Sequence, residues 1–459
     1  MRRIAIASIV AVTGVIAFEH EANACGGCFV PTETPTVVTD HRMILTASKE
    51  QSTLYDQIRY QGDPESFAWV LPIAGTVDVG LSADLLFNAL DQQTATRITP
   101  PPQNCPPPPP DCQFGAASAG NAESDPGGVN VLKKEVVGPF ETVQLQASDP
   151  QALHNWLATN KFTVTPDVKP VIDVYVAEKF NFLALKLLPG KGTQDMRPVR
   201  VTTKGAAVVL PLRMVAAGTG ANVGISLWVV GEGRYEPTNF PTFYISNDEI
   251  AWDWTQNKSN YVDVRAQKTA ASGGKAWEIE SSTVLQRGSF ENVIENGTPW
   301  NGRGPQPQTP EERAQQDYLP VKDEQGNVTK TAEQVRREDL DTLFQGIPEG
   351  NTRVTRMRAD LAKAALATDL VLNASQDQAQ LSNIRQLTKE LNQPQCPIWD
   401  GCNTVGSAPR DEAASRSSNG DGVSTCASSA KKNSSAWMAA GLGFAGLAFA
   451  HAIRRRKKQ

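Results

Sequence analysis

Histidine is scarce in this sequence, and its scarcity removes several kinds of chemistry. Only four of the 459 residues are histidine, and we expect His20 and His451 to lie in segments outside the mature body. His41 and His154 remain, and neither stands in a motif with a partner; we expect His41 at the surface. Zinc sites and nucleophile–histidine pairs commonly need histidine. The sequence therefore predicts no metal site and no cofactor.

Sequence motifs of the common enzyme classes are missing as well. The chain has no H-E-x-x-H, G-x-S-x-G, Walker or Rossmann pattern, each of which places specific groups around a reacting centre. Paired carboxylates such as Asp248 and Glu249 occur, but nothing in the sequence aims them at a common substrate. We therefore favour a protein that is not an enzyme.

A basic surface stripe is also missing. When the first 24 residues and the basic end of the chain are set aside, 37 basic and 47 acidic residues remain, a net charge of −10. Nucleic-acid phosphates demand clustered lysine and arginine. The composition therefore predicts no nucleic-acid partner.

The N-terminus has the pattern of a secretory signal peptide. Arg2 and Arg3 precede an apolar run over residues 4–18, and small residues at Ala22 and Ala24 stand before Cys25. This order is typical of a cleaved export signal, so we assign residues 1–24 to it. A lipoprotein, with Cys25 acylated, is the alternative.

A second apolar run lies near the C-terminus. Residues 436–453 contain no Asp, Glu, Lys or Arg and are long enough to span a bilayer. The basic residues 454–459 follow, and positive charge stays cytoplasmic. We therefore predict one transmembrane helix with the body outside. With Cys426 upstream, this end resembles a myxobacterial-type C-terminal sorting tail, which implies processing near Cys426 and recognition of Arg454, Arg455 and Arg456.

Seven cysteines fall mostly in close pairs. An exported chain meets an oxidising space, so close pairs indicate disulfides. The predicted bridges leave Cys426 alone and are Cys25–Cys28, Cys105–Cys112 and Cys396–Cys402. Two alternatives remain open: thiol–disulfide exchange by Cys25 and Cys28, or a zinc site formed by Cys25, Cys28, Cys105 and Cys112.

The hydrophobic pattern predicts an α+β protein with a β-rich body. Alternating and β-branched runs fill residues 25–296, interrupted by a Pro/Gly-rich insert at 100–130. Helices are expected at 82–90, capped by Ser82, and at 150–157; residues 207–215 are expected to be a strand and 249–268 helical.

A smaller helical region is predicted after a linker at 297–330. It spans 331–402 and opens with a capping pattern at Thr331 and Gln334. Further helices are expected at 354–372 and 381–391, although residues 369–375 fit a strand as well. Residues 403–435 are expected to be a low-complexity stalk.

Several short motifs resemble one family of bacterial exported proteins. They are ACGGCF at 24–29, YQGD at 60–63, FAWVLP at 67–72, FLALKL at 182–187 and TRMRADL at 355–361. The chain is similar to the domain of unknown function 2330 family. That resemblance implies a secreted or surface protein and carries no catalytic residue.

These observations favour a cell-surface or envelope protein that binds a partner or builds the envelope without catalysis. Expected partners are the membrane, an envelope protein or glycan, and the export and sorting machinery. The alternative is an extracytoplasmic enzyme, either a thiol oxidoreductase through Cys25 and Cys28 or a carboxylate-based hydrolase.

Overall fold

The structure is a computed structural model. It describes residues 28–29, 40–57, 67–107, 138–160, 162, 168–192, 195–216, 222–296, 309, 316–322, 325–400 and 402–417. Its elements confirm a β-rich α+β protein. None of the helices in these ranges has the length and apolar character of a membrane span. The predicted signal peptide and transmembrane segment lie outside the described residues.

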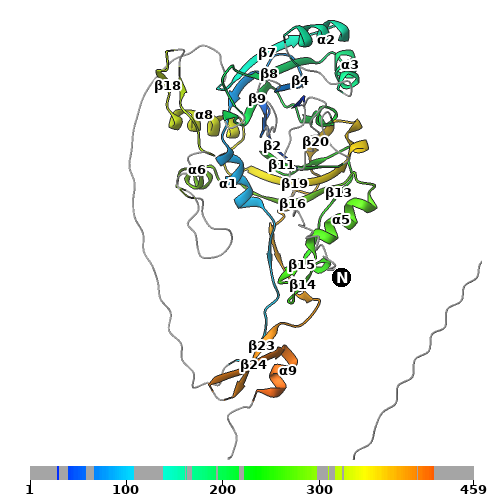
Figure 1. The fold of residues 1–459 in the computed structure, drawn as a ribbon, viewed down its shortest axis with the longest axis vertical. Helices are drawn as coiled ribbons and strands as arrows, with labels where there is room; N and C mark the ends of the chain where they lie inside the picture. Colours follow the sequence, from blue (N-terminus) through cyan, green and yellow to red (C-terminus); the bar gives the residue numbers. More distant parts are fainter. Residues whose placement is uncertain are drawn as a thin grey trace, which may run out of the picture.

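An eight-stranded mixed sheet forms the centre of the molecule (Figure 1). In order across the sheet the strands are β13 (Thr242–Phe243), β16 (Trp277–Val284), β19 (Thr352–Ala362), β11 (Asn222–Glu232), β2 (Asp40–Ala47), β3 (Gln51–Asp56), β9 (Val199–Lys204) and β5 (Asp78–Leu81). β11 pairs antiparallel with β19 along its full 11 residues and parallel with β2 on its other side. The near-continuous apolar run of β11 suits a strand buried on both faces.

A four-stranded antiparallel sheet packs against one face of the large sheet. Its strands, in order, are β1 (Cys28–Phe29), β4 (Ala68–Ile73), β8 (Asn181–Leu187) and β7 (Phe140–Gln146). Successive side chains in a strand point to opposite faces. Trp69 and Leu71 accordingly pack toward Val201 of the large sheet, whereas Val70 packs outward with Ile172.

Helices cover the outer faces of the two sheets. α2 (Pro150–Thr159) and α3 (Lys169–Ala177) cover the small sheet, and α1 (Asp84–Thr94), α6 (Arg287–Asn296) and α8 (Ala332–Phe344) cover the large one (Figure 1). Each sheet is therefore apolar on both faces, and the body is layered helix, sheet, sheet, helix. Among the described residues the remaining helices are α4 (Leu212–Val215), α5 (Tyr261–Ala271), α9 (Arg410–Arg416) and the 3-10 helices η3 (Asn247–Glu249) and η4 (Lys363–Ala367).

Short strands complete the fold. They are β6 (Arg97–Thr99), β10 (Val209–Leu210), β12 (Tyr235–Pro237), β14 (Ala251–Asp253), β15 (Lys258–Ser259), β17 (Val321–Lys322), β18 (Val328–Lys330), β20 (Leu370–Ala374), β21 (Ile384–Gln386), β22 (Lys389–Glu390), β23 (Gln395–Asp400) and β24 (Asn403–Pro409). β6 pairs in parallel with β21, although the two are far apart in sequence.

The predicted helical region at 331–402 is only partly helical. Helix α8 begins at the predicted capping box, in which Thr331 and Gln334 exchange both hydrogen bonds. The expected helices at 354–372 and 381–391 are wrong apart from the 3-10 helix η4 (Lys363–Ala367), because those segments form mainly β19, β20, β21 and β22. β20 confirms the strand alternative at 369–375. β19 is an inner strand of the central sheet, so its partners on both sides override the local helical spacing.

Three other predicted elements also differ. Residues 207–215 are β10 followed by helix α4, and only the second half of 249–268 is helical. The expected stalk at 403–435 begins instead with β24 and α9. Helix α1 begins after Ala83, which makes no side-chain cap. Ser82 does not cap it, because its hydroxyl donates to Asp339 at 2.6 Å.

Asp339 joins the helical layer to the large sheet. Its side chain is fully buried on α8 and accepts hydrogen bonds from Ser82, from Tyr318 at 2.9 Å and from Arg200 of β9 at 2.9 Å. Burial raises the pKa of this carboxyl, and the guanidinium of Arg200 opposes that effect. Arg200 also binds Glu338 at 2.9 Å. A buried charge needs such partners to be tolerated.

Replacement of Asp339 is expected to destabilise the body strongly. Asp339→Ala leaves Arg200 buried without its main partner, which typically costs about 3–5 kcal/mol. The shift of the urea unfolding midpoint, measured with disulfides intact, would report this loss.

A matched control lies on the same helix. Glu333 pairs with Arg337 four residues away, and both side chains are mostly exposed. Glu333→Ala is expected to change stability by about 0.5 kcal/mol or less. Equal effects of the two substitutions would contradict the role given to Asp339.

Candidate functional site

The C-terminal lobe, defined here as residues 395–400 and 402–417, lies beyond the sheets at one end of the molecule (Figure 1). It consists of the β23–β24 hairpin and helix α9. Residues of the predicted Pro/Gly-rich insert lie against it: Trp399 Nε1 donates to the carbonyl of Pro106 at 3.0 Å. Its small core comprises Cys396, Ala408 and Ala413 with Cys105 and Ile398.

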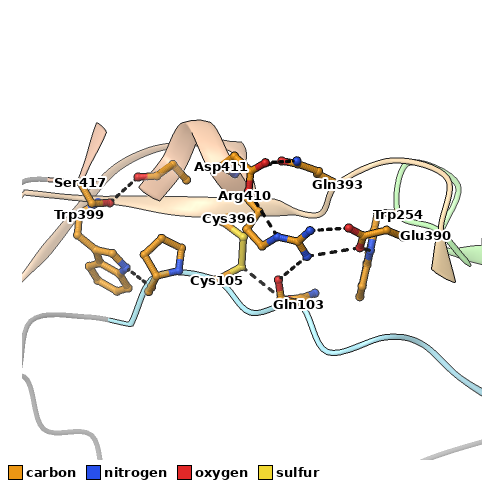
Figure 2. The surroundings of a disulfide bond; sticks show 12 residues. Gln103, Cys105, Trp254, Glu390, Gln393, Cys396, Trp399, Arg410, Asp411 and Ser417 are labelled. Atoms are coloured by element: carbon orange, nitrogen blue, oxygen red, sulfur yellow. Dashed lines mark hydrogen bonds and ion pairs between the residues drawn. A yellow bond between two sulfur atoms is a disulfide. The ribbon is translucent and has the colours of Figure 1, made fainter. Parts of the chain in front are cut away.

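A disulfide joins this lobe to the first half of the chain. Cys105 and Cys396 are bonded, with Cα atoms 5.3 Å apart, although 291 positions separate them in sequence (Figure 2). Cys402 is disulfide-bonded as well. The predicted pairs Cys105–Cys112 and Cys396–Cys402 are therefore wrong, because folding brings the 101–107 segment to β23. The zinc alternative is wrong for the same reason, since the sulfur of Cys105 carries no thiolate.

Polar contacts surround the disulfide (Figure 2). Arg410 of α9 forms an ion pair with Glu390 of β22 and donates to the carbonyl of Gln103 at 3.3 Å. Glu390 also accepts a hydrogen bond from Trp254 Nε1 at 2.9 Å. The hydrogen bond from Arg410 lowers the pKa of Glu390. Arg410 thus connects the lobe to the 101–107 segment and to strand β22.

A buried charge cluster lies on β16, next to the β13 edge of the large sheet. Glu278 and Glu280 project from one face of β16, and Arg265 of α5 donates to them at 2.6 and 2.8 Å. Arg356 of β19 binds Glu280 and also Asp91 of α1. Burial raises the pKa of Glu278. Because each carboxylate is already held by a guanidinium, the cluster fastens α1, α5 and β19 to β16 and lacks free groups for acid–base work.

A cavity of about 180 Å³ lies between the two sheets. Its walls are mainly apolar and come from β2, β3, β4, β9 and the residues before α4. A smaller chamber of about 10 Å³ adjoins it and shares Leu54, Leu71 and Pro211 as walls. An apolar pocket with a few polar groups is the usual form of a small-molecule site.

Polar groups mark the rim of the larger cavity. Asp369 lines it and accepts from Tyr175 at 2.6 Å and from Arg213 Nε at 3.1 Å. Arg213 also binds Glu178, at 2.7 Å, and stacks on the Tyr175 ring. Burial raises the pKa of Tyr175 well above its usual value. Two carboxylates face one guanidinium here, so this cluster carries excess negative charge.

Asp56 opens into the smaller chamber and differs from the other buried carboxylates. It sits at the end of β3, is buried, and its Oδ1 has no hydrogen-bond partner among the described residues. Burial alone raises its pKa to about 7. Such a perturbed, unpaired carboxyl in a cavity marks a functional-site candidate. No sequence pattern predicted this role, because STLYDQ has the alternation of an ordinary half-buried strand.

Two histidines end in different surroundings. His41 is buried on β2, so its expected surface position is wrong, and burial lowers its pKa to about 3. His154 of α2 contacts Asp173 of α3 at 2.7 Å and links these helices. Among the described residues, no group of acidic, histidine or cysteine side chains is arranged to hold a metal ion.

The other predicted site residues are outside the described side chains. Cys28 contributes backbone to β1, opposite Trp69 of β4. The structure does not describe Cys25, Cys112, Cys426, Arg454, Arg455 and Arg456. The redox and sorting assignments therefore stay predictions.

Comparison with known proteins identifies one family. The sequence model of "Uncharacterized protein conserved in bacteria (DUF2330)" matches residues 20–319, more than half of the chain. No curated protein matches the chain. No solved structure matches it either.

The long-range disulfide predicts the behaviour of a nicked chain. A single proteolytic cut anywhere between Cys105 and Cys396 should leave two fragments joined until a reductant is added. Non-reducing peptide mapping should recover the peptides of Cys105 and Cys396 as one species. Recovery of Cys105 linked to Cys112 instead would contradict the structure.

Asp56 predicts an unusual dependence of stability on pH. Its folded-state pKa of about 7 exceeds the ordinary value of 3.8, so between these values the unfolded chain releases a proton that the folded protein keeps. The free energy of unfolding therefore falls as pH rises from about 4 to 7. Above pH 7 Asp56 causes no further decrease. Asp56→Asn should therefore be more stable at pH 8, by up to about 4 kcal/mol, and equal near pH 3.5.

An exposed carboxylate supplies the control. Asp377 is largely exposed in its long contact with Arg234. Asp377→Asn should show no gain that grows with pH in the same denaturant series. A pH-independent gain for Asp56→Asn would show that its carboxyl titrates normally.

Proposed function

The chain belongs to the bacterial DUF2330 family, and we propose that it is an exported protein held at the outer side of a membrane by its C-terminus. We further propose that its body is a non-enzymatic binding or structural module of the cell envelope. The observation that carries this proposal is the Cys105–Cys396 disulfide beside the C-terminal lobe.

The disulfide supports export. Structural disulfides form and persist in oxidising spaces and are rare in the reducing cytosol. The bond sits in the small core of the lobe with Cys396 fully buried, so it is part of the packed structure. This agrees with the signal pattern at residues 1–24.

The position of the disulfide supports attachment through the C-terminus. Strands β6 and β21 run parallel, and both chain segments continue into the lobe. The disulfide joins the end of one segment to the end of the other. A mechanical force applied at residue 417 is therefore divided between the segments that follow β6 and β21. This arrangement suits a module attached through its C-terminus.

The proposed attachment uses the apolar run at 436–453, with the basic residues 454–459 on the cytoplasmic side. Export machinery would read residues 1–24, and sorting machinery would act at Cys426 and Arg454–Arg456. The exposed body would meet an envelope protein or a glycan. In this reading the described sheets face the outside of the cell.

Removal of the C-terminal run tests the attachment. Deletion of residues 436–459 should move the protein from the membrane fraction to the periplasm or medium, because the predicted transmembrane segment is lost. Cell fractionation followed by a carbonate wash would measure the distribution.

A second deletion provides the comparison. Removal of residues 418–435 shortens the connection and keeps the apolar run, so that variant should remain in the membrane fraction. Membrane retention of the protein lacking 436–459 would overturn C-terminal anchoring. Accumulation of both variants in reduced form in the cytosol would overturn export as well.

A further inference from the structure

Asp56 is an exception to the way this protein treats buried charge. Asp339, Glu278 and Glu280 are buried as deeply, and each is bound by an arginine. Asp56 has neither a cation nor a hydrogen bond to Oδ1 among the described residues. A buried polar group without a partner destabilises the folded state. Among the described residues, the fold pairs its other buried carboxylates and leaves this one facing a cavity.

The strands beside Asp56 bring no compensating charge to it. In register it lies opposite Met43 of β2 and Val199 of β9. The ionisable side chains two positions along those strands are His41, which burial keeps neutral, and Arg197, which donates to a backbone carbonyl. The other walls of its chamber, from β4 and the α4 region, are apolar.

The dimensions separate a polar compartment from an apolar one. The chamber beside Asp56, of about 10 Å³, has room for about one water-sized group. The adjoining cavity of about 180 Å³ compares with the roughly 150 Å³ needed for a benzene-sized body. A molecule with one small charged end and an apolar body of ring size fits both at once.

We propose that this inter-sheet cavity binds a small primary amine with an apolar body, its ammonium group seated against the Asp56 carboxylate. A cation is the complement of a carboxylate that has no charge partner, and their hydrogen bond would satisfy Oδ1. The excess negative charge of Asp369 and Glu178 over Arg213 at the rim favours the entry of a cation. The site lies in the body, so it is independent of how the C-terminus is attached.

Binding should depend on pH in one direction. The ammonium pairs with the ionised carboxylate, whereas free Asp56 is largely protonated below pH 7. Affinity should therefore rise by about tenfold per pH unit between pH 5 and 6.5 and level off above pH 7.5. Asp369 and Tyr175 at the rim remain engaged with each other and with Arg213, so Asp56 is the group that sets this profile.

Phenethylamine, an alcohol of equal size and an anion with the same ring test the proposal. The full chain in phosphatidylcholine nanodiscs would be titrated calorimetrically with the amine, with 2-phenylethanol and with 3-phenylpropanoate, and empty nanodiscs would be subtracted. The amine should bind at least tenfold more tightly than either analogue. Asp56→Asn should reduce amine affinity at least tenfold and abolish its pH dependence.

Two further variants separate loss of the site from loss of the fold. Ala207→Trp fills the larger cavity without touching Asp56 and should also weaken amine binding at least tenfold. Glu333→Gln removes an exposed charge from α8 and should leave binding unchanged. Unfolding midpoints no lower than wild type would show that Asp56→Asn folds.

Several results would overturn the proposal. They are the absence of saturable amine binding up to 10 mM, equal binding of 2-phenylethanol, unchanged affinity in folded Asp56→Asn, or affinity that falls as pH rises. Equal binding of the alcohol would show an apolar cavity with one water beside Asp56. Fractionation of the C-terminal deletions reports on anchoring separately, so failure of one proposal leaves the other standing.

Discussion

The antiparallel ladder between β11 and β19 is the constraint on which the rest of the body depends. It joins residues 222–232 to residues 352–362 at the middle of the large sheet, and a hydrophobic core forms on each of the two faces that it creates. On one face Leu227 and Met357 pack with β10, α4 and β20. On the other, Trp228 and Val354 meet α1, α6 and α8. Without this pairing neither core would close, because each contains residues from both strands.

Buried ion pairs then connect the layers that the sheet separates. Arg200 reaches the buried Asp339 of α8, and buried Arg356 reaches Asp91, a half-exposed residue of α1. Buried pairs of this kind add little net stability, but breaking one leaves an uncompensated charge. They therefore specify which helix lies over which strand. Asp56 differs from these carboxylates, because it is buried without an arginine partner among the described residues.

Sequence patterns predicted the elements whose signals are local. The capping box at Thr331 and the start of α2 at Pro150 depend on neighbouring residues and were confirmed. Residues 354–372 were misassigned, although Met357, Ala359 and Leu361 alternate with charged residues as a strand requires. Arg356 belongs to that alternation, but Met357, Leu361 and Ala365 also recur at helical spacing. The burial of Arg356 depends on Glu280 from a distant strand, which local spacing does not reveal.

The disulfide and the buried carboxyl of the candidate site were harder to predict from the sequence than the fold. Close spacing favoured Cys105–Cys112, whereas the true partner of Cys105 is set by the arrangement of β6 and β21. Asp56 became distinctive only when its surroundings were known, because an aspartate at a strand end is ordinarily solvated. The partner of a cysteine distant in sequence and the cavity beside a side chain are properties of the folded chain. A single sequence does not reveal either of them.

The order of cysteines along the chain has a consequence for biogenesis. In the proposed exported protein, Cys105 and Cys112 leave the translocation channel long before Cys396 and Cys402. Oxidation in order of appearance would join Cys105 to Cys112. Formation of the native Cys105–Cys396 bond then requires exchange through a mixed disulfide. β19 is also exported after β11, so one edge of β11 stays unpaired until β19 has crossed the membrane. A disulfide isomerase and a holding chaperone in the receiving compartment are therefore expected requirements for its maturation.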